Sequence, residues 1–195
     1  MIQVLSRAVS EPPIQLTTSL RRAAVTLIIT DSLDLLLIER ATRDGDPWSG
    51  HLGLPGGHVN AGESELDAAI RETSEEIGLQ LTPSQLLGPL NDVVTPALHP
   101  SRQVRPFVFQ VPTLPPLDLD PKEVADALTI PLEDLLSGKN RGTFTLAYKE
   151  TLWKLPCVDL GGRRLWGLTL RIIDDLLARL REVLERRHSN GSTGE

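Results

Sequence analysis

Cysteine and long apolar runs are scarce in this sequence, and each absence excludes a class of protein. Cys157 is the only cysteine among the 195 residues, so no intramolecular disulfide can form, which favours a reducing compartment. No apolar run reaches the roughly 18 residues of a membrane-spanning helix, and the first residues lack the apolar segment of a secretory signal. These absences predict a cytoplasmic protein without a membrane partner, in which Cys157 is buried or incidental.

Basic residues are also outnumbered. The chain has 20 lysines and arginines against 26 aspartates and glutamates, which gives a formal net charge of −6. A protein with this balance has no global electrostatic attraction to nucleic acid or to an anionic membrane, so we expect no nucleic-acid partner. If the protein handles phosphates, it must do so at a local site where a metal cation offsets the acidic groups.

The sequence shows no internal repeat and no long linker, and its length fits one domain with a sizeable core. Residues 1–20 contain Pro12 and Pro13 and predict an irregular lead-in to the domain. Residues 21–188 form the predicted domain itself. Residues 189–195 predict a disordered tail.

Short β-favouring runs and helical patterns are mixed along the predicted domain. The best-defined helix begins after Ser64, a good N-cap, and ends at Gly78, a residue that favours a left-handed C-terminal cap. The mixture predicts an α/β (α+β) domain rather than a repeating βαβ array. The expected extended segments are 23–30, 35–39, 51–59, 86–95, 104–111 and 123–130, and the other expected helices are 131–136 and 165–187.

The helix that follows Ser64 carries an unfavourable pattern of charge. Glu72, Glu75 and Glu76 are spaced so that all three project from one side, and like charges at such spacings cost about 0.2–0.5 kcal/mol per pair. Glu75 and Glu76 also lie in the last turn, where the helix dipole disfavours anions. A sequence selected only for stability would avoid this arrangement, and such violations are most common at functional sites.

A divalent cation resolves this conflict. Magnesium prefers oxygen ligands and is commonly shared between a few carboxylates and substrate phosphates, so the cluster indicates a metal platform for phosphate chemistry. The alternative is a solvated acidic face, which is the commoner explanation for an arbitrary glutamate-rich helix. The surrounding residues decide between the two: Gly57 is followed after five residues by Glu63, and seven residues later by the segment Arg71–Leu79.

The segment from Gly57 to Leu79 resembles the Nudix box, G-x5-E-x7-R-E-U-x-E-E-x-G-U, in which U is a bulky aliphatic residue. Every fixed residue matches without a gap. Thr73 is a mild departure at a U position that keeps the β-branch. The resemblance implies a Nudix fold, in which a mixed β-sheet is sandwiched between helices. It also implies a metal-dependent pyrophosphohydrolase that uses Mg²⁺ or Mn²⁺ and acts on a small nucleotide pyrophosphate.

The resemblance also assigns roles to individual residues. The metal ligands would be the backbone carbonyl of Gly56 and the carboxylates of Glu72, Glu75 and Glu76. Glu63 and Arg71 would steady the cluster, and the catalytic set is therefore Glu63, Arg71, Glu72, Glu75 and Glu76. The general base varies within the family. Glu123 is a candidate from outside the box, and a surface glutamate at the start of a strand is an equal alternative for this residue.

Residues just upstream carry information on the substrate. The segments 36–41 and 50–57 resemble the signature of coenzyme A pyrophosphatases, roughly L-L-x-x-R-[S/A] … G-x3-F-P-G-G, and residues 165–169 are similar to the start of the last helix in that subgroup. Leu54 replaces the usual Phe, the intervening loop is one residue longer, and the second Arg of the signature is missing from its place. The resemblance implies coenzyme A or acyl-CoA as the substrate.

Three residues of the same region are candidates for substrate binding. Arg40 and Arg43 could meet the 3′-phosphate of the nucleotide, and Trp48 could stack on the base. The alternatives are solvated loop arginines and a tryptophan that caps the core. Two other functions stay open: hydrolysis of a nucleotide sugar, ADP-ribose, dinucleotide or nucleoside triphosphate, and a non-catalytic sensor, which usually lacks box glutamates. Homodimers are common in the family, so the resemblance leaves a homodimer open.

Overall fold

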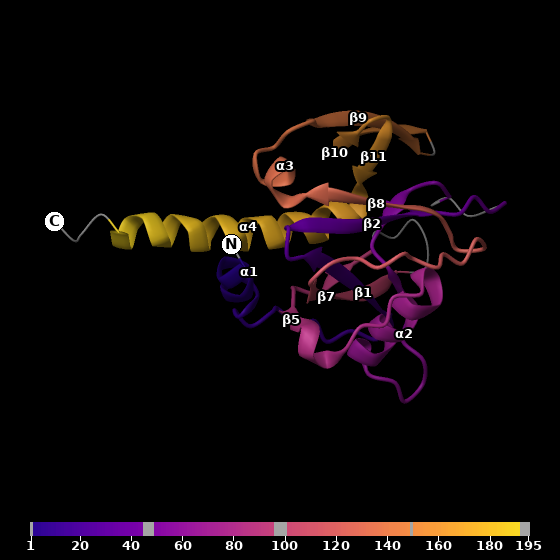
Figure 1. Ribbon diagram of the computed structural model, residues 1–195. Helices are drawn as coiled ribbons and strands as arrows, with labels where there is room; N and C mark the ends of the chain where they lie inside the picture. The colour runs from indigo at the N-terminus through magenta and orange to yellow at the C-terminus, as the bar shows by residue number, and fades with distance from the viewer. Residues whose placement is uncertain (1, 45–48, 96–100, 149, 192–195) are drawn as a thin grey trace.

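A mixed β-sheet forms the centre of the molecule (Figure 1). The structure is a computed structural model that describes residues 2–44, 49–95, 101–148 and 150–191. The central path of the sheet runs β3-β2-β1-β7-β5, while β4 pairs with β1, β6 with β7 and β8 with β2. These strands are β1 (Arg21–Thr30), β2 (Asp34–Arg40), β3 (Leu52–Gly53), β4 (Gly56–His58), β5 (Leu86–Pro89), β6 (Val93–Val94), β7 (Arg102–Val111) and β8 (Val124–Pro131).

The two longest strands of this sheet, β1 and β7, run parallel over ten residue pairs, from Arg21↔Arg102 to Thr30↔Val111. The other pairings in the sheet are antiparallel. Buried side chains occupy both faces of β1, as expected for a strand covered on both sides. The sheet therefore separates two hydrophobic cores, and each core needs a helix to close it.

Helix α2 (Glu65–Ile77) closes one core by packing Ala68, Ala69 and Ile77 against β1 and β4. Its ends confirm the sequence prediction. The Ser64 hydroxyl accepts the backbone N–H of Asp67, and Gly78 adopts the left-handed conformation at φ +69° while its N–H donates to the Ser74 carbonyl.

Helices α4 (Gly167–Gly191) and α1 (Ile2–Val9) close the other core. Leu5 of α1 and Leu176 of α4 are fully buried there, and α1 packs against α4. The irregular lead-in predicted for residues 1–20 is therefore wrong for Ile2–Val9, which form a helix. The tail prediction is also wrong in part, because α4 extends through Gly191; residues 192–195 lie outside the described part of the chain.

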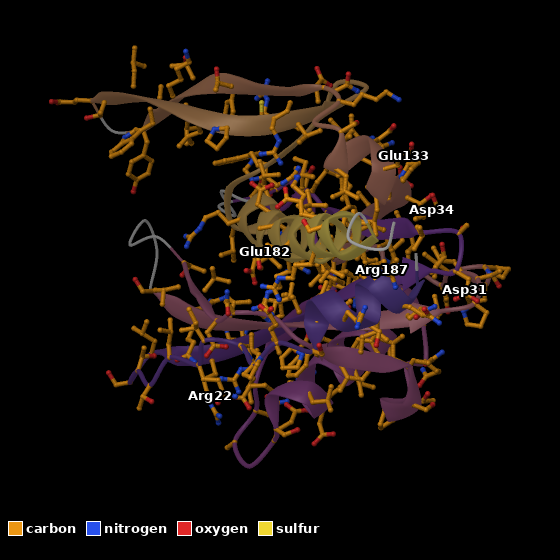
Figure 2. All side chains as sticks on the ribbon, turned by 90° about the vertical axis from the view of Figure 1, so that its left-hand side faces the viewer. Arg22, Asp31, Asp34, Glu133, Glu182 and Arg187 are labelled. Carbon is orange, nitrogen blue, oxygen red and sulfur yellow. The ribbon has the colours of Figure 1, made fainter. Side chains whose placement is uncertain are left out.

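A second, three-stranded sheet lies beyond α4 (Figure 2). It consists of β9 (Arg141–Tyr148), β10 (Thr151–Leu160) and β11 (Arg163–Trp166), and short helix α3 (Leu132–Leu136) precedes it. The sequence pattern leaves residues 141–164 unassigned, and these residues form β9, β10 and the start of β11. The pattern also places the start of the last helix at Leu165, whereas Leu165 and Trp166 pair with β10 as the end of β11.

Cys157 is buried in β10, which agrees with the expected buried residue. Within the described residues, no helix combines the length and the apolar character that crossing a bilayer requires.

Candidate functional site

Arg71 organises the polar side of α2. Its guanidinium donates to both carboxylate oxygens of Glu63, at 2.8 and 3.1 Å, and Nη1 donates to Glu72 at 2.9 Å and to Glu75 at 3.0 Å. Nη2 also donates to the His58 carbonyl at 3.0 Å. The guanidinium of Arg71 thus offsets the charges of three carboxylates and connects α2 to β4. Only arginine can donate hydrogen bonds in several directions from one planar group in this way; the ammonium group of lysine cannot. The bonds from Arg71 hold the pKa of Glu63 below its usual value.

Glu76 lies in a different environment from its neighbours on the helix. Its side chain is 3% exposed, and its Oε2 accepts the backbone N–H of Gly56 at 2.9 Å. Burial raises the pKa of Glu76 to about 7, and the negative charges of Glu123 and Glu72 act in the same direction, while Arg40 opposes them. A buried carboxylate with other carboxylates nearby is costly unless a cation shares the site.

Glu72 lies against the same strand, β4, as Glu76. Burial raises the pKa of Glu72, Arg71 lowers it, and the charges of Glu75 and Glu123 raise it again. A Cβ atom placed on Gly57 would lie only 2.4 Å from the carboxyl carbon of Glu72. The absence of a side chain at Gly57 therefore allows this carboxylate to lie against β4.

Thr73, the departure from the box pattern, is fully buried on the opposite side of α2. Its hydroxyl donates to the Ala69 carbonyl and lies 2.9 Å from the hydroxyl of Thr26 in β1. The polar atom that Thr73 introduces into the core is therefore hydrogen-bonded, which explains why the substitution is tolerated.

The segment before β8 brings a further glutamate to the site. Backbone N–H groups of Asp118 and Asp120 donate to the carbonyls of Ile77 and Glu76, so this segment satisfies the last turn of α2. It then places Glu123 where its charge raises the pKa values of Glu72 and Glu76. No function is expected from the sequence for residues 112–122, because their contacts with the last turn of α2 exist only in the folded chain.

The three candidate substrate residues have different surroundings. Arg43 donates to the Lys122 carbonyl and to Glu123 at 3.2 Å, so its guanidinium is held by the chain. Arg40, at the end of β2, lies close enough to favour the charged form of Glu76. Trp48 lies outside the described residues.

The donor chemistry of the site fits a hard divalent cation. Glu72, Glu75 and Glu76 offer only oxygen ligands, and the crowding of like charge around Glu72 and Glu76 is the kind of penalty that a cation relieves. Among the residues that the structure describes, no three His, Cys, Asp or Glu side chains converge on one point as a ready metal cage. Arg71 holds Glu72 and Glu75, while Glu76 is turned to Gly56.

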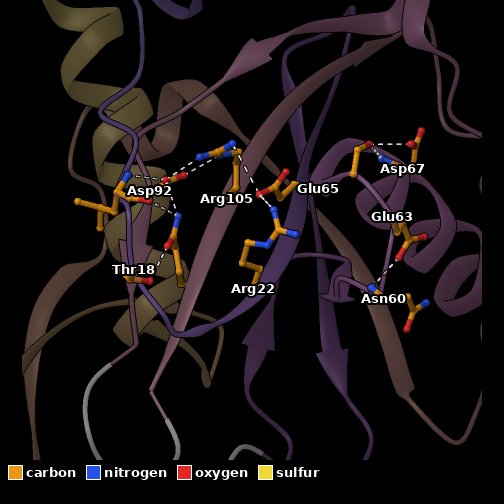
Figure 3. A network of polar contacts seen from close by, with 11 residues as sticks. Thr18, Arg22, Asn60, Glu63, Glu65, Asp67, Asp92 and Arg105 are labelled. Atoms are coloured by element: carbon orange, nitrogen blue, oxygen red, sulfur yellow. Dashed lines mark hydrogen bonds and ion pairs between the residues drawn. The ribbon is translucent and has the colours of Figure 1, made fainter.

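A line of alternating charges that the sequence does not predict lies beside the site (Figure 3). Asp92 bonds Arg105 through both carboxylate oxygens, Arg105 lies 3.8 Å from Glu65 at the start of α2, and Glu65 accepts from Arg22 at 2.7 Å. Nothing in the local sequence signals this network, because its members come from β1, α2, β7 and the loop before β6. It fixes the first turn of α2 against β1 and β7.

Comparisons with known proteins place these features in context. A family model described as NUDIX domain matches residues 20–151, which include every box residue discussed above. The human mitochondrial coenzyme A diphosphatase NUDT8 is 31% identical over 72% of this chain and 60% of its own length. The uncharacterised Nudix hydrolase NudL of Photorhabdus laumondii is 28% identical over 85% of this chain and 88% of its own length.

The chain spans between 35% and 60% of the length of three curated relatives that it matches. Among solved structures, the MutT protein of Methanosarcina mazei superimposes with a TM-score of 0.57 at 20% identity, over 86% of this chain and 98% of the other. A MutT/nudix family protein of Enterococcus faecalis gives a TM-score of 0.60 at 20% identity, over 88% of this chain and 66% of the other. At this level of identity, the likeness concerns the fold alone.

Proposed function

Because this chain belongs to the Nudix family and has its fold, we propose that it hydrolyses the pyrophosphate bond of a nucleoside diphosphate derivative. The observation that carries the proposal is the placement of Glu76 against Gly56 and of Glu72 against Gly57 in β4, with Arg71 bracing the acidic helix. The reaction is attack by water on one phosphorus atom. A new bond forms between the water oxygen and that phosphorus, and the bond to the bridging oxygen breaks.

We propose that the site holds Mg²⁺ or Mn²⁺ through the Gly56 carbonyl and the carboxylates of Glu72, Glu75 and Glu76. The bound ion would lower the pKa of a coordinated water and offset charge on the phosphate oxygens. Arg71 and Glu63 position the acidic helix through the bonds described above. The proton of the attacking water would pass to a box glutamate or to Glu123, whose charge acts on both Glu72 and Glu76.

Coenzyme A or acyl-CoA is the proposed substrate, and it would yield 4′-phosphopantetheine (or its acyl form) and adenosine 3′,5′-bisphosphate. Two observations support this choice: the similarity of residues 36–57 to the coenzyme A pyrophosphatase signature, and the 31% identity to a protein named as a coenzyme A diphosphatase. Arg40, Arg43 and Trp48 remain the sequence-based candidates for nucleotide contacts. The cytoplasm remains the predicted compartment, although the human relative is named as mitochondrial.

A substrate panel tests this proposal. Purified protein with Mg²⁺ or Mn²⁺ is assayed against coenzyme A, acetyl-CoA, ADP-ribose, NADH, a diadenosine polyphosphate and nucleoside triphosphates. We expect coenzyme A or its acetyl ester to have the highest kcat/KM. If coenzyme A stays intact while another member is cut rapidly, the pyrophosphatase assignment stands and the substrate assignment is wrong. If no member is cut, the activity itself is refuted and a sensor becomes the better hypothesis.

Glu76→Gln tests the placement of the site. The substitution keeps the size of the side chain but removes a buried negative charge, so we expect kcat to fall at least 100-fold, roughly the loss of one key electrostatic group. We expect the thermal midpoint to stay near that of the wild type, as checked by circular dichroism. Glu133→Gln, an exposed glutamate on α3, is the matched control and should keep full activity. Full activity in Glu76→Gln would refute the site.

A further inference from the structure

An arginine in the loop after β2 holds the glutamate that precedes β8. The Arg43 guanidinium donates from Nη2 to Oε1 of Glu123 at 3.2 Å, and from Nε to the backbone carbonyl of Lys122 at 2.8 Å. Nη2 also donates to that carbonyl. Because one planar group bonds two consecutive residues, it fixes both the backbone and the side chain at Glu123. The bond to Oε1 leaves the second oxygen, Oε2, to accept a proton.

The backbone around Arg43 is itself held on both sides. The Arg43 N–H donates to the Ser49 hydroxyl at 2.9 Å, and the Ser49 hydroxyl donates to the Arg43 carbonyl at 2.9 Å. The Ala41 N–H donates to the Glu123 carbonyl at 2.9 Å, so the start of the loop is joined directly to the residue that Arg43 holds. The guanidinium therefore extends from a backbone whose position relative to Glu123 is already set.

Backbone hydrogen bonds place Glu123 beside the last turn of the acidic helix. The Asp120 N–H donates to the Glu76 carbonyl, and the Glu123 N–H donates to the Asp120 carbonyl, both at 2.9 Å. The pairing of β2 with β8 acts from the other side, because Val124 is the partner of Arg40. The position of Glu123 agrees with its charge raising the pKa of Glu76. Glu123 is therefore a member of the site and not an isolated surface residue.

The other acidic side chains of the site have donors of their own. Glu72 and Glu75 accept from Arg71, and Glu76 accepts from the Gly56 N–H. Arg43 gives Glu123 the same kind of support. A substrate phosphate on the Arg43 guanidinium would have to displace these contacts, so holding Glu123 and binding a phosphate compete for the same donors.

We propose that Arg43 is a positioning residue that holds the Glu123 carboxylate so that Oε2 takes the proton of the attacking water. The inference rests on the proposed function and deepens it, because it selects Glu123 over the box glutamates as the proton acceptor. In this step the water oxygen bonds to phosphorus while its proton moves to Oε2, and the bridging oxygen leaves with the electron pair of the broken bond. Arg43 acts on the reaction only through Glu123.

A double-mutant comparison tests this coupling. Arg43→Gln, Glu123→Gln and the double variant are assayed with Mg²⁺ on the panel member that the wild type cuts fastest. We expect kcat of Glu123→Gln to fall about 100-fold or more, the usual contribution of a general base. Arg43→Gln should lower kcat about 10- to 100-fold and change KM by less than about twofold, because the carboxylate is misplaced while substrate contacts remain. The double variant should be no slower than Glu123→Gln, since Arg43 then has nothing to position.

Two further variants separate positioning from charge and from stability. Arg43→Lys keeps the charge but cannot bond the carbonyl and the carboxylate from one planar group, so it should regain only part of the lost kcat. Arg163→Gln is the matched control, because the Arg163–Asp126 side chains are 41% and 47% exposed, against 46% and 44% for Arg43–Glu123. It should keep wild-type kcat and KM. Pairs this exposed contribute little to stability, so the thermal midpoint should stay unchanged in both glutamine variants.

Calorimetric titration of adenosine 3′,5′-bisphosphate, a product of the proposed reaction, gives a readout that does not depend on turnover. A positioning role keeps the Kd of Arg43→Gln within about twofold of the wild-type value, whereas a lost phosphate contact would raise it about 10- to 100-fold. The inference is overturned if Kd and KM rise in Arg43→Gln, if its kcat stays at the wild-type level, or if the two single losses multiply in the double variant. A wild type that cuts no panel member instead refutes the proposed function, and the inference falls with it.

Discussion

At the scale of single residues, Gly57 of β4 is important because it has no side chain. The carboxylate of Glu72 on α2 occupies the space that a side chain at Gly57 would fill. The atoms that a Cβ would meet belong to the end of the Glu72 side chain, which can rotate away at little cost in stability. We therefore predict that Gly57→Ala lowers kcat about 10- to 100-fold, because a displacement of about 1 Å at a reacting group can have such an effect. The free energy of unfolding should change by less than about 1 kcal/mol.

Two other glycines serve as references for this prediction. A Cβ on Gly56 would lie 2.2 Å from the backbone oxygen of Ala24, and Gly56 has φ +143°, so Gly56→Ala should destabilise the fold itself. A Cβ on Gly142 in β9 would meet nothing within 4 Å, so Gly142→Ala should change neither stability nor kcat. Steady-state kinetics and urea unfolding of the three variants separate these effects. Wild-type kcat in Gly57→Ala would show that the position of Glu72 is unimportant.

At the scale of elements, α1 depends on its neighbours for stability. A helix of eight residues is too short to be stable alone, and α1 persists because Leu5, Val4 and Ala8 are buried against α4 and the sheet. Leu5→Ala should lower the free energy of unfolding by about 2–5 kcal/mol, the usual cost of such a cavity. Urea denaturation measures this loss.

Ser6→Ala on the exposed side of α1 is the control for Leu5→Ala and should be nearly neutral. If both substitutions are neutral, α1 does not pack against α4 in solution. The same comparison gives a check on activity: kcat of Leu5→Ala should stay near the wild-type value at temperatures where the protein is folded, because α1 lies on the face of the sheet opposite to α2.

The elements that the sequence predicted well are those with local signals. Ser64 and Gly78 define the ends of α2 without help from the rest of the chain, and the box spacing located Arg71 among the glutamates. Helix α1 escaped prediction although Val4, Leu5, Ala8 and Val9 recur at helical spacing, because a pattern of only eight residues is too short to specify a helix without its tertiary contacts. Strand β11 escaped because Leu165 and Trp166 also fit the helical pattern that follows, and only their pairing with β10 makes them extended. Pairings of this kind depend on residues that are distant in sequence.

At the scale of the whole molecule, polar networks fasten the segment between α1 and β1 to both the sheet and α4. The N–H of Leu16 donates to Asp92, and the N–H of Ile14 donates to Asn91, whose side chain is also bonded to Arg179 of α4. The Asp92 network continues through Arg105 to the first turn of α2, as described above. One buried carboxylate therefore connects the N-terminal segment, β7 and the helix that carries the catalytic glutamates.

Asp92 is the member of this network on which the pH dependence of stability should depend. Burial alone would raise the pKa of Asp92, but the bonds from Arg105 and from the Leu16 N–H outweigh burial and hold the pKa below its usual value of 3.8. A carboxylate whose pKa is depressed in the folded state stabilises the protein fully above the unfolded pKa. That contribution is lost as the pH falls through the folded pKa, because the folded protein must then take up a proton that the unfolded chain already holds.

Asp92→Asn should therefore lower the free energy of unfolding by about 3 kcal/mol at neutral pH, since Arg105 loses its buried partner. The difference between the wild type and Asp92→Asn should stay constant from pH 7 down to about pH 5, and it should shrink below about pH 4 as the wild type loses its advantage. Urea unfolding at intervals from pH 3 to pH 7 measures this difference. Asp44→Asn, an exposed aspartate, is the control and should follow the wild type at every pH. If the difference in the free energy of unfolding between the wild type and Asp92→Asn is as large at pH 3 as at pH 7, Asp92 stabilises the fold through its shape and hydrogen bonds alone. The charge of Asp92 would then have no part in joining the N-terminal segment to the sheet.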